Sequence, residues 1–158
     1  MSNIFNNIMF NINRGYYRYI GTGSSRDVFD LKNGYVIKVA KNIAGIAQNQ
    51  TEYAISNYDD SNLFAKVISI SNDFYFLVME KADKIDNISD VFRYFNVSDK
   101  RELFHLKELQ NIKKKYNLLL GDFDRKSNWG IIKGRPVIID YGFTREVSER
   151  YYWLIYGR

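Results

Sequence analysis

Residues 121–143 read GDFDRKSNWGIIKGRPVIIDYGF, and this stretch decides the fold that we predict. Two short apolar runs, WGIIK and PVIID, flank a KGR turn, a pattern typical of a compact β-hairpin. Asp122, Asp124 and Asn128 precede the first run, and Asp140 ends the second. Because the two ends of a hairpin are adjacent in space, we expect these side chains to cluster. Carboxylate and amide oxygens suit Mg²⁺ that is shared with substrate phosphates.

The segment before this stretch predicts the longest helix of the chain, beginning at a cap on Ser98 or Asp99 and ending at Gly121. Shorter helices are predicted around residues 88–95 and over residues 145–156. On the long helix we expect His105 to be exposed or half-buried rather than catalytic. Its apolar residues recur at three- and four-residue spacing: Leu103, Leu106, Leu109, Ile112, Tyr116 and Leu119.

The first half of the chain has a different pattern. Residues 16–40 read as three antiparallel strands, YYRYIGTG, RDVFDL and YVIKVA, with an Asn-Gly turn before the third. A helix is predicted over residues 46–57, and AKVISIS and DFYFLVME predict a second hairpin that extends the same sheet. The predicted class is therefore α+β, with a five-stranded antiparallel sheet and one helix, followed by a helical part that carries the hairpin.

A glycine turn and a strand lysine carry the chemistry of the first half. A loop at Gly21 and Gly23 can lie close over phosphates, and Val28 on the returning strand can cover a base. Lys38 lies between apolar strand residues, so its ammonium needs a carboxylate or phosphate partner, which Glu52 on the next helix can supply. Two structural alternatives remain open. The glycines can serve a hairpin that needs positive φ angles, and the lysine and glutamate can be a purely structural ion pair.

The order of these features resembles the protein-kinase-like superfamily: glycine loop, strand lysine, helix glutamate, apolar strand LVME, Asp…Asn loop and Asp-x-Gly. More narrowly, the QN..E helix and the NWG…DYG ending are similar to small kinase-like proteins encoded by bacteriophages. The resemblance covers about residues 16–144. It implies one minimal kinase-like domain over residues 1–158, with an N-lobe at about 16–82 and a reduced C-lobe at about 83–158.

The resemblance also implies a cofactor, ATP, and residues that bind it. Gly21 and Gly23 would cover the phosphates, and Lys38 would pair with them and with Glu52. The hinge over residues 78–82 would present backbone groups to adenine. Its members include Glu80 and Ala82.

The metal and catalytic roles fall on the hairpin stretch. The resemblance implies that Asn128 and Asp140 hold Mg²⁺. The family places its catalytic Asp five residues before the Asn, where this chain has Phe123, so Asp122 is our preferred base and Asp124 the alternative. Asp and Asn can also be simple turn formers, because their side chains bond their own backbone.

Two departures from the family pattern matter for function. Arg26 stands where the pattern has its third glycine, and fourteen residues follow Thr144, which leaves no room for a full activation segment. The first function that we predict is an ATP- and Mg²⁺-dependent phosphotransferase acting on a host macromolecule or on itself. The alternative is a pseudokinase-like module that binds and inhibits a host protein.

The composition of the chain limits the kinds of chemistry and of binding partner that are possible. The chain has no cysteine and one histidine, which excludes disulfides, thiolate zinc sites and most histidine-based catalysis. A net charge of +5 among 158 residues favours an anionic partner such as a nucleotide, while direct nucleic-acid binding lacks a recognition motif. No apolar run reaches the length of a membrane span, so we expect a cytoplasmic protein, in the host cytoplasm if phage-encoded. We further expect a buried Trp129 and Tyr141 and a solvated face at residues 113–115.

Overall fold

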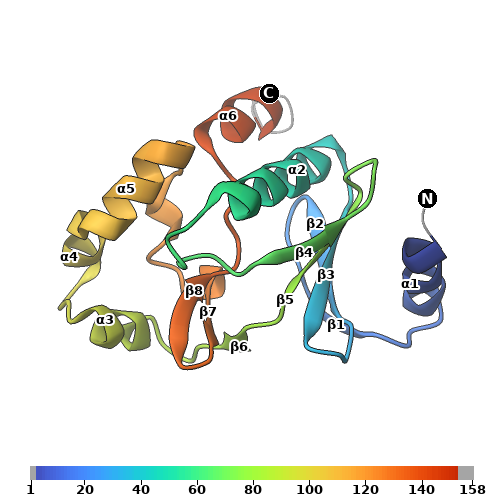
Figure 1. The fold of residues 1–158 in the computed structure, drawn as a ribbon, viewed down its shortest axis with the longest axis horizontal. Helices are drawn as coiled ribbons and strands as arrows, with labels where there is room; N and C mark the ends of the chain where they lie inside the picture. The colour runs from blue at the N-terminus through green and yellow to red at the C-terminus, as the bar shows by residue number, and fades with distance from the viewer. Residues whose placement is uncertain (1–2, 153–158) are drawn as a thin grey trace.

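The computed structural model describes residues 3–152, apart from the side chain of Asp122. The larger sheet has five strands, and Figure 1 shows a helix on each of its faces, followed by a smaller part built from short helices and a hairpin. All neighbouring strands of the large sheet are antiparallel, and the strand order is β1-β2-β3-β5-β4. The strands are β1 (Arg18–Thr22), β2 (Arg26–Asp30), β3 (Tyr35–Ala40), β4 (Val67–Ile70) and β5 (Phe76–Glu80). The predicted α+β class with five antiparallel strands is therefore confirmed.

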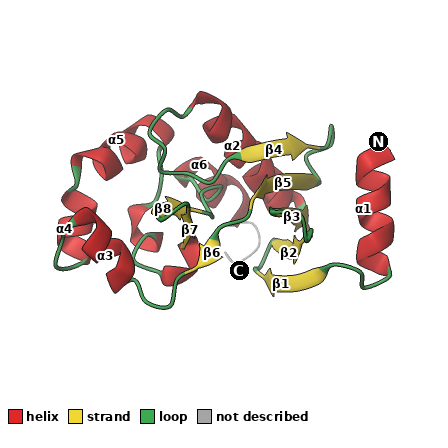
Figure 2. Ribbon diagram, turned by 60° about the horizontal axis from the view of Figure 1, so that its bottom comes forward, coloured by secondary structure: helices red, strands yellow, loops and turns green. Residues whose placement is uncertain are grey.

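The two faces of the sheet are covered by different helices (Figures 1 and 2). Helix α1 (Asn3–Asn13) covers the outer face, where Phe5 stacks on Phe76 with ring centroids 5.7 Å apart. Sequence reasoning missed this helix, although Phe5 and Ile8 have helical spacing and both are buried. Helix α2 (Ile43–Tyr58) lies on the inner face and replaces the predicted 46–57 helix with slightly wider bounds.

The start of α2 explains its close approach to the sheet. The Asn42 side chain caps the helix by accepting a hydrogen bond from Gly45 N at 3.1 Å. A Cβ atom on Gly45 would lie 2.2 Å from the carbonyl oxygen of Ser25 and 3.1 Å from Ala40, so only glycine fits at this crossing. Glycine at position 45 therefore allows the start of α2 to pack directly against the backbone that follows the glycine turn.

The second half of the chain contains a three-stranded sheet, β6-β7-β8, and several short helices. Its α-helices are α3 (Ser89–Phe95), α4 (Lys100–His105), α5 (Lys107–Tyr116) and α6 (Arg145–Val147). Its strands are β6 (Asp83–Lys84), β7 (Trp129–Ile132) and β8 (Arg135–Ile138), with 3₁₀ turns at Leu120–Asp122 and Lys126–Asn128. The predicted helix near 88–95 and the β7–β8 hairpin are confirmed. A π-helix at Ser148–Tyr152 follows α6, and residues 153–156 of the predicted last helix lie outside the described part.

The long helix predicted from Ser98 to Gly121 is wrong, because the chain breaks at Leu106 (ψ 133°) between α4 and α5. The cap on Asp99 is confirmed, since its side chain accepts from Glu102 N. The physical reason for the break lies in the spacing of the apolar residues. Steps of three residues drift by about 60° each on a straight α-helix, so the stripe would rotate away from the core. The break lets Leu103 and Leu109 both be fully buried.

One hydrophobic core joins the two halves. The segment after α2 lies beside β8, with Ala65 N donating to Ile138 O at 3.0 Å and Ile138 N donating to Leu63 O at 2.7 Å. Trp129 and Tyr141 are buried in this core, as predicted. The hairpin that carries the polar residues is therefore attached firmly to the larger sheet.

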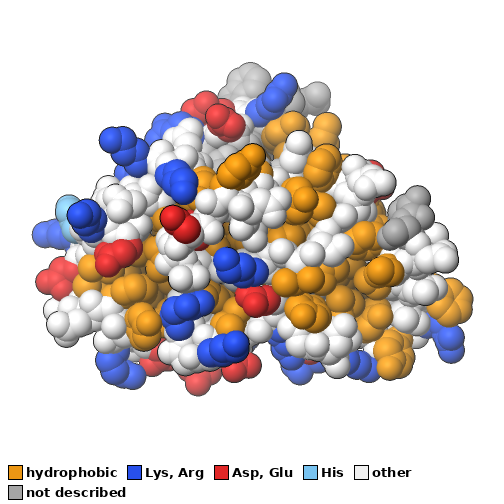
Figure 3. Space-filling model, in the orientation of Figure 1, with side chains coloured by type: hydrophobic (Ala, Val, Ile, Leu, Met, Phe, Trp, Pro, Cys, Tyr) orange, Lys and Arg blue, Asp and Glu red, His pale blue; other side chains and the backbone are white. Residues whose placement is uncertain are grey.

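The surface carries mixed charge. On the face in Figure 3, the blue Lys and Arg side chains are scattered among white and red ones, and apolar side chains gather over the five-stranded sheet. His105 and Lys113, Lys114 and Lys115 are exposed, as predicted. Within residues 3–152, no helix is both long and apolar enough to cross a membrane.

Candidate active site

Lys38 is placed by the alternation of β3. Ile37 and Val39 point to the outer face and pack with α1, while Val36 and Lys38 belong to the inner face that α2 covers. The Lys38 Nζ atom lies 2.9 Å from both carboxylate oxygens of Glu52 and donates a 2.6 Å hydrogen bond to Ile139 O. The partnership predicted between the strand lysine and the helix glutamate is thus present.

Arg26 is the residue that sequence reasoning missed. The sequence placed it only as a departure at a glycine position, but its side chain is 6% exposed and reaches the centre of the site. Its Nη1 and Nη2 atoms form a fork on Glu52 at 2.8 and 2.9 Å, and Nη2 also lies 2.8 Å from Asp140 Oδ1. We call Arg26, Lys38, Glu52 and Asp140 the ion cluster. It contains two positive and two negative groups.

Burial and charge compete in setting the pKa values of the ion cluster. Burial alone would raise the pKa of Glu52, but Arg26 and Lys38 outweigh it and hold that pKa at about 2. Burial would lower the pKa of Arg26, yet Glu52 and Asp140 raise it above its usual range. For Lys38, burial prevails over the attraction of Glu52, and Arg26 adds to the lowering of the pKa. Glu52 is therefore a firmly ionised anchor for two cations.

Glu52 also fixes the loop that follows β8. The backbone N–H groups of Tyr141 and Gly142 both donate to Glu52 Oε1 at 3.1 Å. A Cβ atom on Gly142 would lie 2.6 Å from Gln48 O, so this glycine allows the loop to lie directly on α2. Helix α2 and the Asp-Tyr-Gly segment are consequently held together at the residue next to Asp140.

The β7–β8 hairpin places the backbone of Asn128 beside Ile139, the residue before Asp140. Ile139 N donates to Asn128 O at 2.8 Å, across the open end of the hairpin. The two residues offer an amide and a carboxylate, and the Asp140 side chain is 49% exposed. No group of three or more acidic or histidine side chains that could hold a metal ion occurs among the described residues. This donor set fits Mg²⁺ that completes its coordination with water and substrate phosphate oxygens.

The two candidate bases differ in what the structure says of them. The backbone of Asp122 belongs to the 3₁₀ turn at Leu120–Asp122, and its side chain lies outside the described part. Asp124 is 29% exposed and lies 3.4 Å from Lys100 Nζ at the start of α4. Phe123 between them is buried, and its carbonyl oxygen accepts a hydrogen bond from Trp129 Nε1. The choice between Asp122 and Asp124 stays a prediction.

The glycine turn connects β1 and β2 beside a register shift between Tyr19 and Gly21. Gly21 and Gly23 do not have the positive φ angles that a hairpin alternative requires. A Cβ atom on Gly21 would meet nothing within 4 Å, so the space beside this turn is open. Backbone strain therefore does not explain the glycines. Val28, half-buried, packs against the core from the returning strand.

The predicted hinge follows β5 toward the second half. Glu80 N donates to Lys66 O at 2.9 Å, and the Glu80 carboxylate accepts from Lys66 N. Ala82 is half-buried, and its Cβ lies 2.5 Å from where a Cβ on Gly130 would be, which places the hinge directly against β7. The segment predicted to contact adenine is thus the connection between the two halves.

Tyr152 tethers the end of the described chain to the glycine turn. Its hydroxyl lies 2.6 Å from Ser25 Oγ and 3.3 Å from Ser24 Oγ, and it also bonds the Gln48 side chain. No local pattern predicts this contact, because the partners are more than 100 positions apart. The glycine turn, α2 and the C-terminal segment therefore meet at one hydroxyl.

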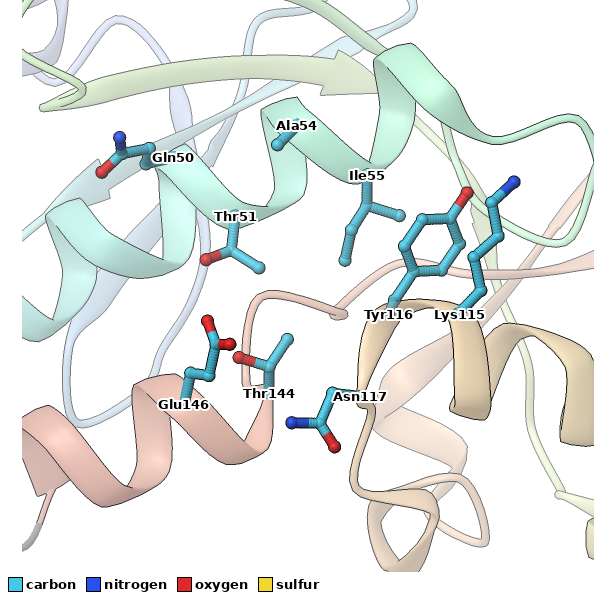
Figure 4. A pocket seen from close by; sticks show the side chains of 9 residues that line it. All are labelled: Gln50, Thr51, Ala54, Ile55, Lys115, Tyr116, Asn117, Thr144 and Glu146. Carbon is cyan, nitrogen blue, oxygen red and sulfur yellow. The ribbon is translucent and has the colours of Figure 1, made fainter.

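A pocket lies between α2, the end of α5 and the start of α6 (Figure 4). Thr51 of α2, Thr144 and Glu146 of the α6 region and Asn117 after α5 face one another there. None of the predicted site residues lines it. This pocket is consequently separate from the site built around Lys38.

Comparison with known proteins rests on structure alone, because no family model and no curated protein matches the sequence. The complex of the aminoglycoside phosphotransferase APH(2")-IIa with streptomycin and ATP aligns with a TM-score of 0.50 and 18% identity, covering 90% of this chain and 72% of that chain. The fold of this chain is therefore similar to that of APH(2")-IIa. The gentamicin complex of APH(2")-IIa aligns with a TM-score of 0.47 and 17% identity, covering 90% of this chain and 71% of that chain. The crystal structure of Cex1p aligns with a TM-score of 0.49 and 17% identity, covering 89% of this chain and 31% of that chain. At these identities the likeness concerns the fold.

Proposed function

We propose that this protein is an ATP- and Mg²⁺-dependent phosphotransferase. The observation that carries the proposal is the linkage at Glu52, which bonds Lys38 and also receives the N–H groups of Tyr141 and Gly142. In protein kinases the strand lysine must pair with the helix glutamate while the Asp of the Asp-x-Gly segment holds the metal. Here the Glu52 carboxylate binds both the strand lysine and the backbone of the Asp-Tyr-Gly segment.

In the proposed mechanism, adenine lies against the hinge at Glu80 and Ala82 with Val28 above it. The glycine turn covers the phosphates, and Lys38 binds their oxygens. Bound Mg²⁺ would neutralise charge on the transferring phosphoryl group, and Asn128 and Asp140 would hold it.

Asp122 accepts the proton of the acceptor hydroxyl as that oxygen bonds to the γ-phosphorus. The bond to the β–γ bridging oxygen breaks, and ADP leaves. The protein thus contributes positioning and charge stabilisation rather than a covalent intermediate.

The proposed acceptor is a hydroxyl on a host macromolecule or on this chain, in keeping with the resemblance to phage-encoded kinase-like proteins. APH(2")-IIa was solved with ATP and with streptomycin or gentamicin, so a small-molecule acceptor is the competing class. A second candidate function, an inactive binding module, is favoured by one observation. Arg26 already occupies one oxygen of Asp140, the residue that would hold the metal.

The nucleotide part of the proposal is tested by thermal unfolding with Mg²⁺ and a non-hydrolysable ATP analogue. A ligand that binds only the folded state raises the melting temperature by mass action. We expect a rise for the wild type, none for Lys38→Met or Asp140→Asn, and a reduced rise for Glu52→Gln. A folded wild type without any rise at millimolar nucleotide contradicts the proposal.

A further inference from the structure

Arg26 makes more contacts than a structural partner of Glu52 requires. Both terminal nitrogens bind Glu52, and Nη1 also donates to Asn49 Oδ1 at 3.1 Å. The additional bond runs from Nη2 to Asp140 Oδ1 at 2.8 Å. Because the fork on Glu52 alone would neutralise that carboxylate, the contact with Asp140 is a separate feature of the site.

The two ends of this contact lie in different environments. The Arg26 side chain is 6% exposed, whereas the Asp140 side chain is 49% exposed. Asp140 therefore faces the guanidinium on its inner side and solvent on its outer side. A metal ion that approaches from solvent meets a carboxylate that already binds a cation.

We propose that Arg26 and Mg²⁺ compete for Asp140, so that Arg26 holds this carboxylate in the nucleotide-free protein and releases it when Mg²⁺-nucleotide binds. This inference rests on the proposed function and adds a residue that sets its metal requirement. A dication at Asp140 would repel a guanidinium nitrogen that lies within hydrogen-bond distance of the same oxygen. Binding of either cation at Oδ1 therefore weakens binding of the other.

The contacts of Arg26 make the exchange local. Glu52 and Asn49 keep the guanidinium in place when the bond to Asp140 is lost, and Arg26 is anchored in β2 by its pairing with Ala40 of β3. The released N–H of Nη2 then faces the side of the site where Asp140 lies. There it is available to a phosphate oxygen beside Lys38.

The test measures how much Mg²⁺ is needed for nucleotide to stabilise the protein. The melting temperature is recorded at a fixed concentration of a non-hydrolysable ATP analogue while Mg²⁺ is titrated. We expect Arg26→Gln to lower the half-maximal Mg²⁺ concentration about tenfold, the equivalent of one charge-assisted hydrogen bond. Arg26→Lys keeps a positive charge near Asp140, so it should lower the half-maximal Mg²⁺ concentration less. Arg93→Gln removes one exposed charge from α3 and should leave it unchanged.

The outcomes separate the inference from the proposed function. A purely structural Arg26 would lower the melting temperature at every Mg²⁺ concentration without moving the midpoint, and that result overturns the inference. A higher midpoint in Arg26→Gln or Arg26→Lys overturns it too, because Arg26 would then assist the metal. If Arg26→Gln does not fold, Arg26→Lys decides the matter by the same criterion. A wild type that nucleotide never stabilises overturns the proposed function, and the inference with it.

Discussion

The two halves of this protein hold their site residues in different ways. In the first half, Lys38 and Glu52 lie on regular elements, are almost fully buried and have several bonds each. In the second half, Asp124 and Asp140 lie at the ends of short turns or strands and are partly exposed. The difference indicates that the residues proposed to hold the phosphates lie on rigid structure, whereas those proposed to hold the metal and to act as the base lie on short, more exposed segments.

The largest expected effect is a difference in the free energy of unfolding between a variant in the first half and a variant in the second half. Glu52→Ala leaves Arg26 and Lys38 buried without their shared carboxylate, so we expect unfolding to cost about 3–5 kcal/mol less. Asp124→Ala removes only a partly exposed ion pair with Lys100 and should cost about 1 kcal/mol or less. Urea unfolding of both variants measures the contrast. Equal losses would contradict the view that the first half carries the rigid part of the site.

Acid unfolding sharpens the same comparison. The pKa of Glu52 is about 2 in the folded protein against an ordinary value of 4.5, so the unfolded state binds the proton first. The stabilisation is complete above about pH 4.5 and is lost as the pH falls toward 2. Asp30 and Asp73 also have lowered pKa values and add to the acid loss. The Glu52→Gln variant keeps the contribution of Asp30 and Asp73 but loses that of Glu52. The free energy of unfolding of this variant should therefore fall less between pH 5 and 2 than that of the wild type. Identical slopes would mean that Glu52 is not the anchor.

A glycine pair tests the contact between the halves. Gly142→Ala places a methyl group against the backbone of Gln48 in α2, and we expect a loss of about 1–3 kcal/mol from the strain of that contact. Gly121→Ala enters open space and should change stability by about 0.5 kcal/mol or less. Chemical denaturation of both variants provides the measurement. A tolerated Gly142→Ala would show that the Asp-Tyr-Gly loop is not held directly against α2.

Sequence reasoning found the parts of the site that follow from regular patterns. Strand alternation and helical position were enough to pair Lys38 with Glu52, and the hairpin placed Asn128 near Asp140. Arg26 could not be found in this way, because a family pattern with glycine at that position says nothing about where a long side chain will reach. The contact of Tyr152 with Ser25 also depends on tertiary packing alone.

Two errors in the predicted fold have local physical causes. No helix was predicted for the N-terminal segment, although the apolar spacing of Phe5 and Ile8 carried the signal for α1. The break at Leu106 was missed because three-residue steps were counted as helical without following their drift around the axis. Summing the angles from Leu103 to Ile112 would have predicted it.

Phosphate transfer itself is measured by intact-mass spectrometry after incubation with Mg²⁺-ATP, alone and with a host lysate. The account predicts phosphate on a protein or on this chain, lost in Asp122→Ala although that variant is still stabilised by nucleotide, and retained in Asp124→Ala. If phosphate transfer is lost in Asp124→Ala instead, the catalytic base is Asp124 and not Asp122. Absence of transfer to any acceptor by a wild type that binds nucleotide would contradict the phosphotransferase and leave the binding module.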